Sequence, residues 1–230
     1  MSTRVGGVSP EPLGMNLSFK VGDDPANVVE NRKRFIGSLG FVESETAIPH
    51  QCHSSNVHIV FKPGEYEACD GLVTQTRGLP LIVTVADCLP VVLYDSAKSV
   101  LGLVHAGWRG TAQGIVAETV DIMVKQCGSS TSGMVAYFGP SAGVCCYEVG
   151  WDVAEAFSLD QVEQREDRLY LDLKKANRDQ LLSTGLSEEN IEISAYCTIC
   201  TPQLFHSHRR DRNKSGRMMA AATLLDHLGV

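Results

Sequence analysis

Two side chains that commonly bind metals, Cys88 and His105, lie at the ends of short apolar runs. Cys88 falls in the break between Leu81–Val85 and Val91–Tyr94, and His105 directly follows Val100–Val104. We interpret the three runs as buried strands, because each is short, apolar and rich in β-branched residues. Polar side chains at the ends of buried strands are well placed for chemistry, so we expect Cys88 and His105 to share a metal ion.

His53 is the best candidate for a third ligand. It lies in a polar segment just before the predicted strand Val57–Phe61. A zinc ion held by two histidines and one cysteine keeps its fourth tetrahedral position open, which is typical of catalytic rather than structural zinc. The alternative is that each of the three is an ordinary buried or surface residue without a ligand role. The pattern alone leaves both interpretations open.

A glycine-rich turn, Gly107–Gly110, follows the third apolar run and precedes a predicted helix. Backbone N–H groups at such a turn and the positive end of the helix dipole suit an anion such as phosphate. Arg109 in the turn, and Arg209 and Arg210 later in the chain, carry the side chain best matched to phosphate oxygens. A tight strand-to-helix turn and solvated arginines are the plainer alternatives.

Four further cysteines form a rival metal-site candidate. Cys197 and Cys200 have the CxxC spacing, and Cys145 with Cys146 would complete a set of four thiolates. A single CxxC without a second one at the proper spacing is a weak signal. Adjacent cysteines also point apart in an extended segment. We therefore favour inert buried thiols at these positions.

The composition is that of an ordinary soluble globular protein. Hydrophobic residues make up 43% of the 230 residues and charged residues 20%, so a sizeable core can form without disulfides. The net charge of −7 argues against a general nucleic-acid-binding role, because such proteins carry a basic face. Residues 208–217 contain five Lys or Arg and one Asp, a local positive charge that better suits a small anion.

Eight cysteines without a visible signal peptide indicate reduced thiols and a cytoplasmic protein. The apolar runs are far shorter than the ~20 residues of a membrane span, so we expect no membrane partner. There is no repeat, low-complexity segment or interdomain linker. We expect residues 1–13 to form a loosely held, flexible arm and residues 14–230 to form one catalytic domain, as a monomer or weak homodimer.

Hydrophobic periodicity and turn residues predict both strands and helices, and hence an α/β domain. Beyond the runs already named, we expect strands at Gly14–Phe19, Val57–Phe61, Leu72–Thr74, Met134–Phe138 and Ile191–Tyr196. We expect helices from Pro25, capped by Asp24, to about Gly40, and at Thr111–Cys127, Val153–Leu159, Leu173–Ser183 and Gly216–Leu228.

A series of short motifs spans nearly the whole chain, from Gly14 to Arg217. The motifs are His53, Ala86–Cys88, His105–Gly110 (HAGWRG), Gly139–Pro140, Cys146–Val149, Cys197–Thr198, Arg209–Asp211 and Gly216–Arg217. Their types and order resemble the polyphenol oxidase (laccase-domain) family, whose members are also called purine nucleoside phosphorylases. The HAGWRG segment is the most specific part of this resemblance.

The resemblance implies a single-domain layered α/β sandwich of mixed sheets flanked by helices. It implies one zinc ion held by His53, Cys88 and His105, with copper as an alternative metal. It also implies phosphorolysis of adenosine, inosine, guanosine and methylthioadenosine, and deamination of adenosine. Purine nucleosides and phosphate would then be the partners.

Specific roles for individual residues follow as expectations. We expect a catalytic role for Asp87, Arg109, Arg209 and Arg210, and substrate binding by Asn16, Gln51, Asp70, Gly107 and Gly110. In deamination, zinc would lower the pKa of a bound water, and a carboxylate, Asp87 or Asp70, would shuttle protons. In phosphorolysis, the arginines would neutralise the phosphate in the transition state.

The sequence departs from the family pattern at three positions. Ser54 follows His53 where the family usually has glycine, and His206 and His208 stand where aromatic residues are common. These changes border the expected pocket, so they bear on substrate preference and leave the metal ligands intact. His206 and His208 would share one face of a strand, where they could bind a metal or form a polar rim.

Other functions remain as alternatives. A multicopper laccase centre needs many histidines in HxH and HCH pairs, and this chain has seven histidines with one HxH pair. Phenol oxidation would therefore be a side activity of copper in a mononuclear site. Family relatives are also named peptidoglycan editing factors, which implies hydrolysis of wrongly loaded amino acids from cytoplasmic wall precursors. A non-catalytic metal-binding or partner-binding module would keep its function after Cys88→Ala.

Overall fold

The three apolar runs around Cys88 form strands that are divided between two sheets. In the computed structural model, which describes residues 1–225, the first run is strand β5 (Leu81–Val85). The next two are β6 (Leu89–Asp95) and β7 (Val100–Ala106), which pair in antiparallel fashion along their whole length. Every residue of β7 is buried, because both faces of its sheet are covered.

Strands β6 and β7 lie at the centre of a six-stranded mixed sheet with the order β12-β8-β6-β7-β4-β2. The other members are β2 (Val57–Ile59), β4 (Gly71–Thr74), β8 (Met134–Phe138) and β12 (Ile191–Ile193). Strand β8 has its predicted bounds, whereas β2 and β12 are shorter than predicted. The sheet contains both parallel and antiparallel pairs.

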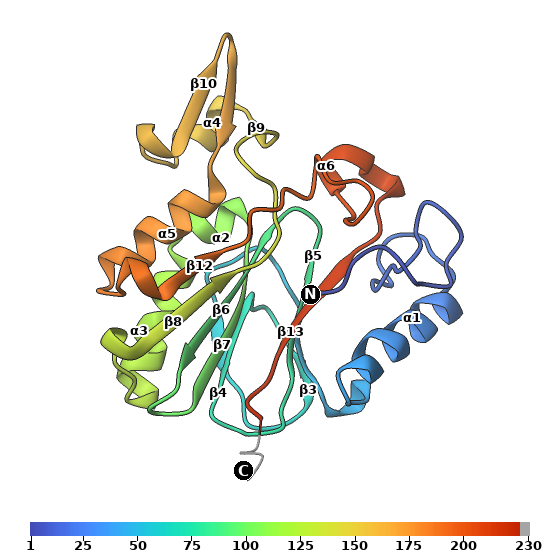
Figure 1. Cartoon of the computed structure of the whole chain (residues 1–230), viewed down its shortest axis with the longest axis horizontal. Coiled ribbons are helices and arrows are strands. Elements are labelled where there is room, and N and C mark those ends of the chain that lie inside the picture. The colour runs from blue at the N-terminus through green and yellow to red at the C-terminus, as the bar shows by residue number, and fades with distance from the viewer. Residues whose placement is uncertain (226–230) are drawn as a thin grey trace.

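Strand β5 belongs to a four-stranded sheet with the order β13-β5-β1-β3. Its partners are β1 (Ala47–Pro49), β3 (Gly64–Tyr66) and β13 (Met218–Ala222). A third, small sheet contains β9 (Glu148–Val149), β10 (Val162–Arg165) and β11 (Arg168–Leu171). It projects from one end of the molecule (Figure 1).

The two larger sheets pack face to face, and helices cover their outer faces (Figure 1). Leu103 of β7 and Val83 of β5 belong to the core between the sheets. Helix α3 (Ile115–Cys127) packs on the outer face of the six-stranded sheet, and α1 (Pro25–Ser38) packs on that of the four-stranded sheet. This layering confirms the predicted single-domain α/β sandwich of mixed sheets flanked by helices.

The helix predictions were confirmed in part. Helix α1 begins as predicted, with the Asp24 carboxylate accepting the N–H of Ala26, and α5 (Leu173–Ser183) has its predicted bounds. The single helix predicted at Thr111–Cys127 was wrong, because Gly114, at φ +80°, separates α2 (Trp108–Ala112) from α3. The remaining helices are α4 (Trp151–Ala154), shorter than and displaced from the predicted Val153–Leu159, and α6 (His208–Asp211). Short 3-10 turns lie at Glu43–Glu45, Thr131–Gly133, Leu159–Gln161, Glu188–Asn190 and Arg212–Lys214.

The helix predicted at Gly216–Leu228 is wrong in the part that the structure describes. Strand β13 occupies Met218–Ala222 and pairs in antiparallel fashion with β5. Met218 and Ala220 contact the core between the sheets, whereas Met219 contacts the core beneath α1. Burial on two faces with period two favours a strand, and it overrides the helix propensity of Met and Ala. Residues 226–228 of this prediction lie outside the described residues.

The N-terminal segment has no helix or strand. The strand predicted at Gly14–Phe19 is therefore wrong, although Leu17 is buried against α1 and its N–H donates to the carbonyl of Arg217. Residues 1–13 attach to the body through backbone hydrogen bonds from Ser2 to Met219 and from Arg4 to Leu204. The flexibility of this arm and the domain boundary at residue 14 stay predictions. Within residues 1–225, no helix has both the length and the apolarity to cross a membrane.

His206 is fully buried in the loop before α6. A buried histidine makes the stability of the fold depend on pH. Burial, together with the charge of Arg4, lowers its pKa to about 4. The unfolded chain, with an ordinary histidine pKa, binds more protons between pH 4 and 6.5, so His206 stabilises the fold above pH 6.5 and loses this contribution as the pH falls. We expect His206→Phe to reduce the loss of unfolding free energy from pH 8 to pH 5 by about 2 kcal/mol.

Urea unfolding of both proteins at the two pH values measures this difference. The exposed His58 provides the matched control, because His58→Phe retains His206 and hence its pH dependence. Equal pH dependence in the wild type and His206→Phe would contradict the assignment.

Candidate metal centre

The pairing of β6 with β7 brings Cys88 close to His105. Leu89 lies opposite Ala106 and Pro90 opposite His105, so Cys88, just before β6, meets the end of β7. Gly107 fits into this contact, since a Cβ atom there would lie 3.1 Å from Cys88 Sγ and 3.2 Å from His53 Cδ2. We expected Gly107 to bind substrate, and we now propose that it leaves space for the metal ligands.

His53 completes the group of three. One ligand atom from each of His53, Cys88 and His105 lies within 4.8 Å of the others. The two imidazole rings meet edge to face, with their centroids 5.0 Å apart and their planes at 81°. His105 is buried, Cys88 is half-buried and His53 is exposed, so one side of the group opens toward solvent.

The loop that carries His53 packs closely against Gly110. His53 has a left-handed backbone, at φ +61°, which is unusual for a residue with a side chain. Gly110 lies against the same loop, where a Cβ atom would approach the carbonyl oxygen of Ser54 to 2.7 Å. We therefore propose that Gly110, like Gly107, is required for close packing around the metal ligands rather than for substrate contact.

Asp70 joins the His53 loop to His105. Its Oδ1 accepts hydrogen bonds from His105 Nδ1 at 2.8 Å and from the His53 N–H at 3.0 Å. Its Oδ2 accepts the N–H of Ser54 at 2.7 Å, the Ser54 hydroxyl at 3.0 Å and the Cys52 N–H at 3.1 Å. A carboxylate on one ring nitrogen directs the other toward a metal, as is usual for histidine ligands.

The charges at His53, Cys88 and His105 favour the binding of a metal cation. Burial of the Cys88 thiol opposes ionisation, but the charges and hydrogen bonds of His105 and His53 lower its pKa to about 6. Burial opposes protonation of His105, but Cys88 and Asp70 raise its pKa to about 9. Asp70 is completely buried, yet its hydrogen bonds hold its pKa well below the usual range. The thiolate and the Asp70 carboxylate thus favour a positive charge beside them.

These donors fit a mononuclear metal site. Two imidazoles and one thiolate are common zinc ligands, and three protein ligands leave a fourth position for water or substrate. Within residues 1–225, the only other group of at least three potential ligands contains four cysteines and no histidine. The described residues therefore do not provide the histidine clusters of a multicopper centre.

A cavity of about 590 Å³ lies near the metal ligands, although none of the three lines it. Its walls include Trp108, directly after Gly107, and Tyr147, which lies near enough to Cys88 and Arg209 to be affected by their charges. Burial raises the pKa of Tyr147 well above its usual value. The sequence analysis gave no functional role to Trp108 or Tyr147. Both residues lie in motifs of the family, and this position could have identified them.

The three candidate arginines have different environments. Arg209 lines the cavity, lies over the Tyr147 ring at 5.1 Å and donates to the carbonyl of Glu148. Arg109 is exposed and stacks on Trp108 at 4.3 Å. The guanidinium of Arg210 instead donates to the Asp211 carboxylate and to three backbone carbonyls. Arg210 therefore holds the α6 loop, which argues against its predicted role in phosphate binding.

Asp87 also acts as a support. Its Oδ1 accepts the Thr198 hydroxyl at 2.7 Å, and its Oδ2 accepts the Ser207 hydroxyl at 3.0 Å and the Arg209 N–H at 2.7 Å. Its left-handed backbone, at φ +83°, turns the chain between β5 and β6. These contacts position Arg209 and Cys88, so we propose a positioning role for Asp87 in place of proton transfer.

Two predicted substrate-binding residues make structural contacts instead. Gln51 exchanges hydrogen bonds with the backbone N–H and carbonyl of Thr84, at 2.7 and 2.8 Å, and so ties its loop to β5. Asn16 is completely buried and bonds to Ser18, Asp23 and the N–H of Arg217. Neither side chain lines the cavity near the metal ligands. Their predicted role in substrate binding therefore has no support in these contacts.

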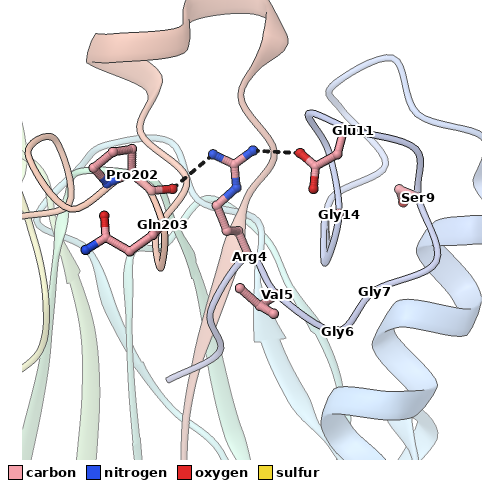
Figure 2. Close-up of a pocket in the computed structure, with 9 residues that line it drawn as sticks. All are labelled: Arg4, Val5, Gly6, Gly7, Ser9, Glu11, Gly14, Pro202 and Gln203. Carbon is pink, nitrogen blue, oxygen red and sulfur yellow. Dashed lines mark hydrogen bonds and ion pairs between the residues drawn. The ribbon is translucent and has the colours of Figure 1, made fainter.

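A second hollow lies between the N-terminal arm and the loop at Pro202 and Gln203, and Figure 2 shows its lining. Arg4 is the cation in it, and it donates to the Glu11 carboxylate at 3.2 Å and to the carbonyls of Pro12 and Pro202. Because its charge is already paired, this hollow is a poor anion site. It shares no residue with the metal ligands.

Comparisons with known proteins agree with this geometry. The family model described as "Multi-copper polyphenol oxidoreductase laccase" matches residues 1–225. The chain belongs to this family.

Among its relatives, a purine nucleoside phosphorylase of Deinococcus radiodurans is 40% identical, over 97% of this chain and 87% of that protein. "Adenosine deaminase RL5", from an unknown prokaryotic organism, is 34% identical over 89% of this chain and 84% of that protein. The crystal structure of YlmD from Geobacillus stearothermophilus superposes with a TM-score of 0.93 at 33% identity, covering 97% of this chain and 90% of that one. The family resemblance predicted from the motifs is therefore confirmed.

Proposed function

We propose that this laccase-domain protein is an enzyme that phosphorolyses purine nucleosides and also deaminates adenosine, with zinc bound by His53, Cys88 and His105. The observation that carries the proposal is the short path from these ligands to a cavity with aromatic and arginine walls. Gly107 lies against Cys88 and His53, and the next residue, Trp108, lines the cavity. Relatives named purine nucleoside phosphorylase and adenosine deaminase support the same two reactions. Adenosine, inosine, guanosine and methylthioadenosine are the proposed substrates.

The cavity walls match the parts of a nucleoside. Trp108 and Tyr147 offer aromatic surface on which a purine ring can stack. Burial raises the pKa of the Tyr147 hydroxyl even further above neutral pH, and the protonated hydroxyl can donate a hydrogen bond. The cavity is within the size range of small-molecule sites.

Phosphate is the proposed second substrate. Arg209 and Arg109 both lie near Tyr147, because the charge of each lowers the pKa of its hydroxyl. In phosphorolysis a phosphate oxygen forms a bond to ribose C1′, the bond from C1′ to the purine nitrogen breaks, and the purine accepts a proton. The two guanidinium groups would hold the phosphate and neutralise its charge.

Zinc would supply Lewis acidity and a lowered pKa for water at the open position. In deamination water adds to purine C6 and ammonia leaves. The chain's own contribution is to hold the purine against Trp108 and Tyr147 and to keep the ligands fixed through Asp70. Copper at the same ligands, with phenol oxidation as a side activity, is the proposed minor alternative. No feature of the cavity specifically supports hydrolysis of cell-wall precursors.

The test is to incubate purified protein with inosine or adenosine, with and without phosphate, and to follow free base, ribose 1-phosphate and inosine. We expect base and ribose 1-phosphate in equal amounts when phosphate is present, and inosine from adenosine without it. Absence of any phosphate-dependent product would contradict the phosphorylase proposal. Formation of inosine without any phosphate-dependent product would indicate that the protein is only a deaminase.

Arg209→Ala tests the phosphate site. We expect the KM for phosphate to rise about 10- to 100-fold, the effect of losing one or two charged hydrogen bonds, with a smaller change in the KM for inosine. The matched control is Arg34→Ala on α1, which removes an exposed guanidinium paired with Glu30. An equal rise in both KM values would indicate that Arg209 supports the cavity rather than the phosphate.

A further inference from the structure

The four cysteines predicted to be inert buried thiols come together at one place. The sulfur atoms of Cys145, Cys146, Cys197 and Cys200 lie within 4.8 Å of one another. Cys145 and Cys200 are exposed, so the prediction of buried thiols was wrong for these two. The assumption of an extended segment was also wrong, because the Cys146 N–H donates to the carbonyl of Gly143 and forms a turn.

The backbone around Cys197 is folded as in a metal-binding loop. Its sulfur accepts the N–H of Gly143 at 3.3 Å, and the nearby backbone N–H groups of Cys200, Gly143 and Ile199 lower the pKa of its thiol. Several N–H donors on one sulfur stabilise a negative thiolate. Gly143 also permits the approach of the two cysteine pairs, since a Cβ atom there would lie 3.3 Å from both Cys145 Sγ and Cys197 Cβ.

Positive side chains flank the four sulfurs. Lys174, which donates to the carbonyls of Ser194 and Tyr196, is close enough to interact electrostatically with Cys145 and Cys197. Arg165 donates to the Cys145 carbonyl at 3.2 Å. A divalent cation with four thiolates carries a net charge of about −2, so two neighbouring cations reduce the repulsion within such a complex.

We propose that Cys145, Cys146, Cys197 and Cys200 bind a zinc ion in a second, structural metal site. Four thiolates close the tetrahedral shell and leave no position for substrate, which distinguishes this site from the open His53, Cys88 and His105 group. Thiolates favour zinc among the common divalent metals. Binding forms four Zn–S bonds and releases the thiol protons to solvent, and no group is oxidised or reduced.

The second site joins the loop at Cys146, which lines the cavity, to the loop at Cys197 and Cys200, which does not. Cys146 directly precedes Tyr147, and Thr198, between Cys197 and Cys200, donates to Asp87. The two loops also meet at a β-bridge between Ser141 and Cys197, where the Thr198 N–H donates to the Ser141 carbonyl at 3.0 Å. Zinc would therefore fix Tyr147 relative to Arg209. The site does not depend on the proposed function, because it holds no substrate.

Metal analysis of Cys88→Ser protein tests the proposal apart from catalysis. This variant removes a ligand of the open site, so protein purified under reducing, anaerobic conditions should retain one zinc per chain. Replacing that zinc with Co²⁺ should give the strong near-ultraviolet thiolate-to-metal absorption of four sulfur ligands. The cobalt spectrum needs no change at the four cysteines, so it does not depend on the folding of a cysteine-site variant.

A second substitution locates the metal. Adding Cys200→Ser to Cys88→Ser should reduce the zinc content from one to near zero, whereas adding Cys127→Ser, at the half-buried end of α3, should leave it at one. Cys88→Ser protein without zinc would overturn the proposal, as would unchanged zinc after Cys200→Ser. A Cys145–Cys200 disulfide found by peptide mapping of this protein would also overturn it.

Discussion

Replacing Cys88 with alanine is expected to reduce kcat/KM for inosine by at least about 10³-fold, because a catalytic metal contributes several kcal/mol to transition-state stabilisation. Cys88 is the only thiolate of the open group, and its pKa, lowered to about 6, keeps it ionised at neutral pH. Its loss leaves the two imidazoles of His53 and His105 without a thiolate. Phosphorolysis rates and the metal content of the same sample provide the measurement.

Cys127→Ala is the matched control for this experiment. Cys127 is another free, half-buried cysteine, but it lies at the end of α3 rather than in the group of three. We expect the control to keep both metal and activity. Full phosphorolysis activity of Cys88→Ala would contradict a catalytic role for a metal bound by His53, Cys88 and His105.

Asp70→Asn is expected to weaken metal binding at the open site by about 10- to 100-fold, the usual effect of losing a carboxylate behind a histidine ligand. An amide offers one acceptor oxygen and one donor group, whereas the Asp70 carboxylate accepts five hydrogen bonds from N–H and O–H donors. At least one of these donors would face an NH₂ group. Competition with a zinc chelator measures the affinity, and urea unfolding measures the accompanying loss of stability.

Asp95→Asn is the control that separates a specific effect on the metal ligands from a general loss of fold stability. Asp95 is similarly buried and accepts the N–H groups of Ala97, Lys98 and Ser130, but it lies at the other end of β6. We expect it to lower the unfolding free energy without changing zinc affinity. Equal zinc affinities of Asp70→Asn and wild-type protein would show that Asp70 does not orient the ligands.

The Asp70 contacts also explain how a loop ligand is held as firmly as a strand ligand. His105 is fixed within β7, whereas His53 belongs to a loop with few backbone contacts of its own. Asp70 directly precedes β4, the neighbour of β7, and its carboxylate binds three consecutive residues of that loop. The sheet thereby transmits its rigidity to His53. This arrangement satisfies the need of a metal site for a rigid supporting shell.

The sequence alone was sufficient for features that depend on near neighbours. Strands β5 and β8 and helix α5 have their predicted bounds, because each is a short apolar or amphipathic segment flanked by turn or cap residues. The three candidate metal ligands were also selected from residue type and position at strand ends, and the structure places them together. Side-chain chemistry and local periodicity carry this information.

The tertiary structure decided which distant residues meet. Asp70 and His105 are 35 positions apart, and Cys145 and Cys200 are 55 apart. Arg210 was indistinguishable from Arg209 in the sequence, but only the fold shows that its guanidinium is bound by Asp211 and backbone carbonyls. Strand β13 formed where local propensity favoured a helix, because β5 offered an edge and two cores accepted its alternating side chains. Burial and partner choice depend on the whole chain, whereas propensity and ligand type reside in the residue itself.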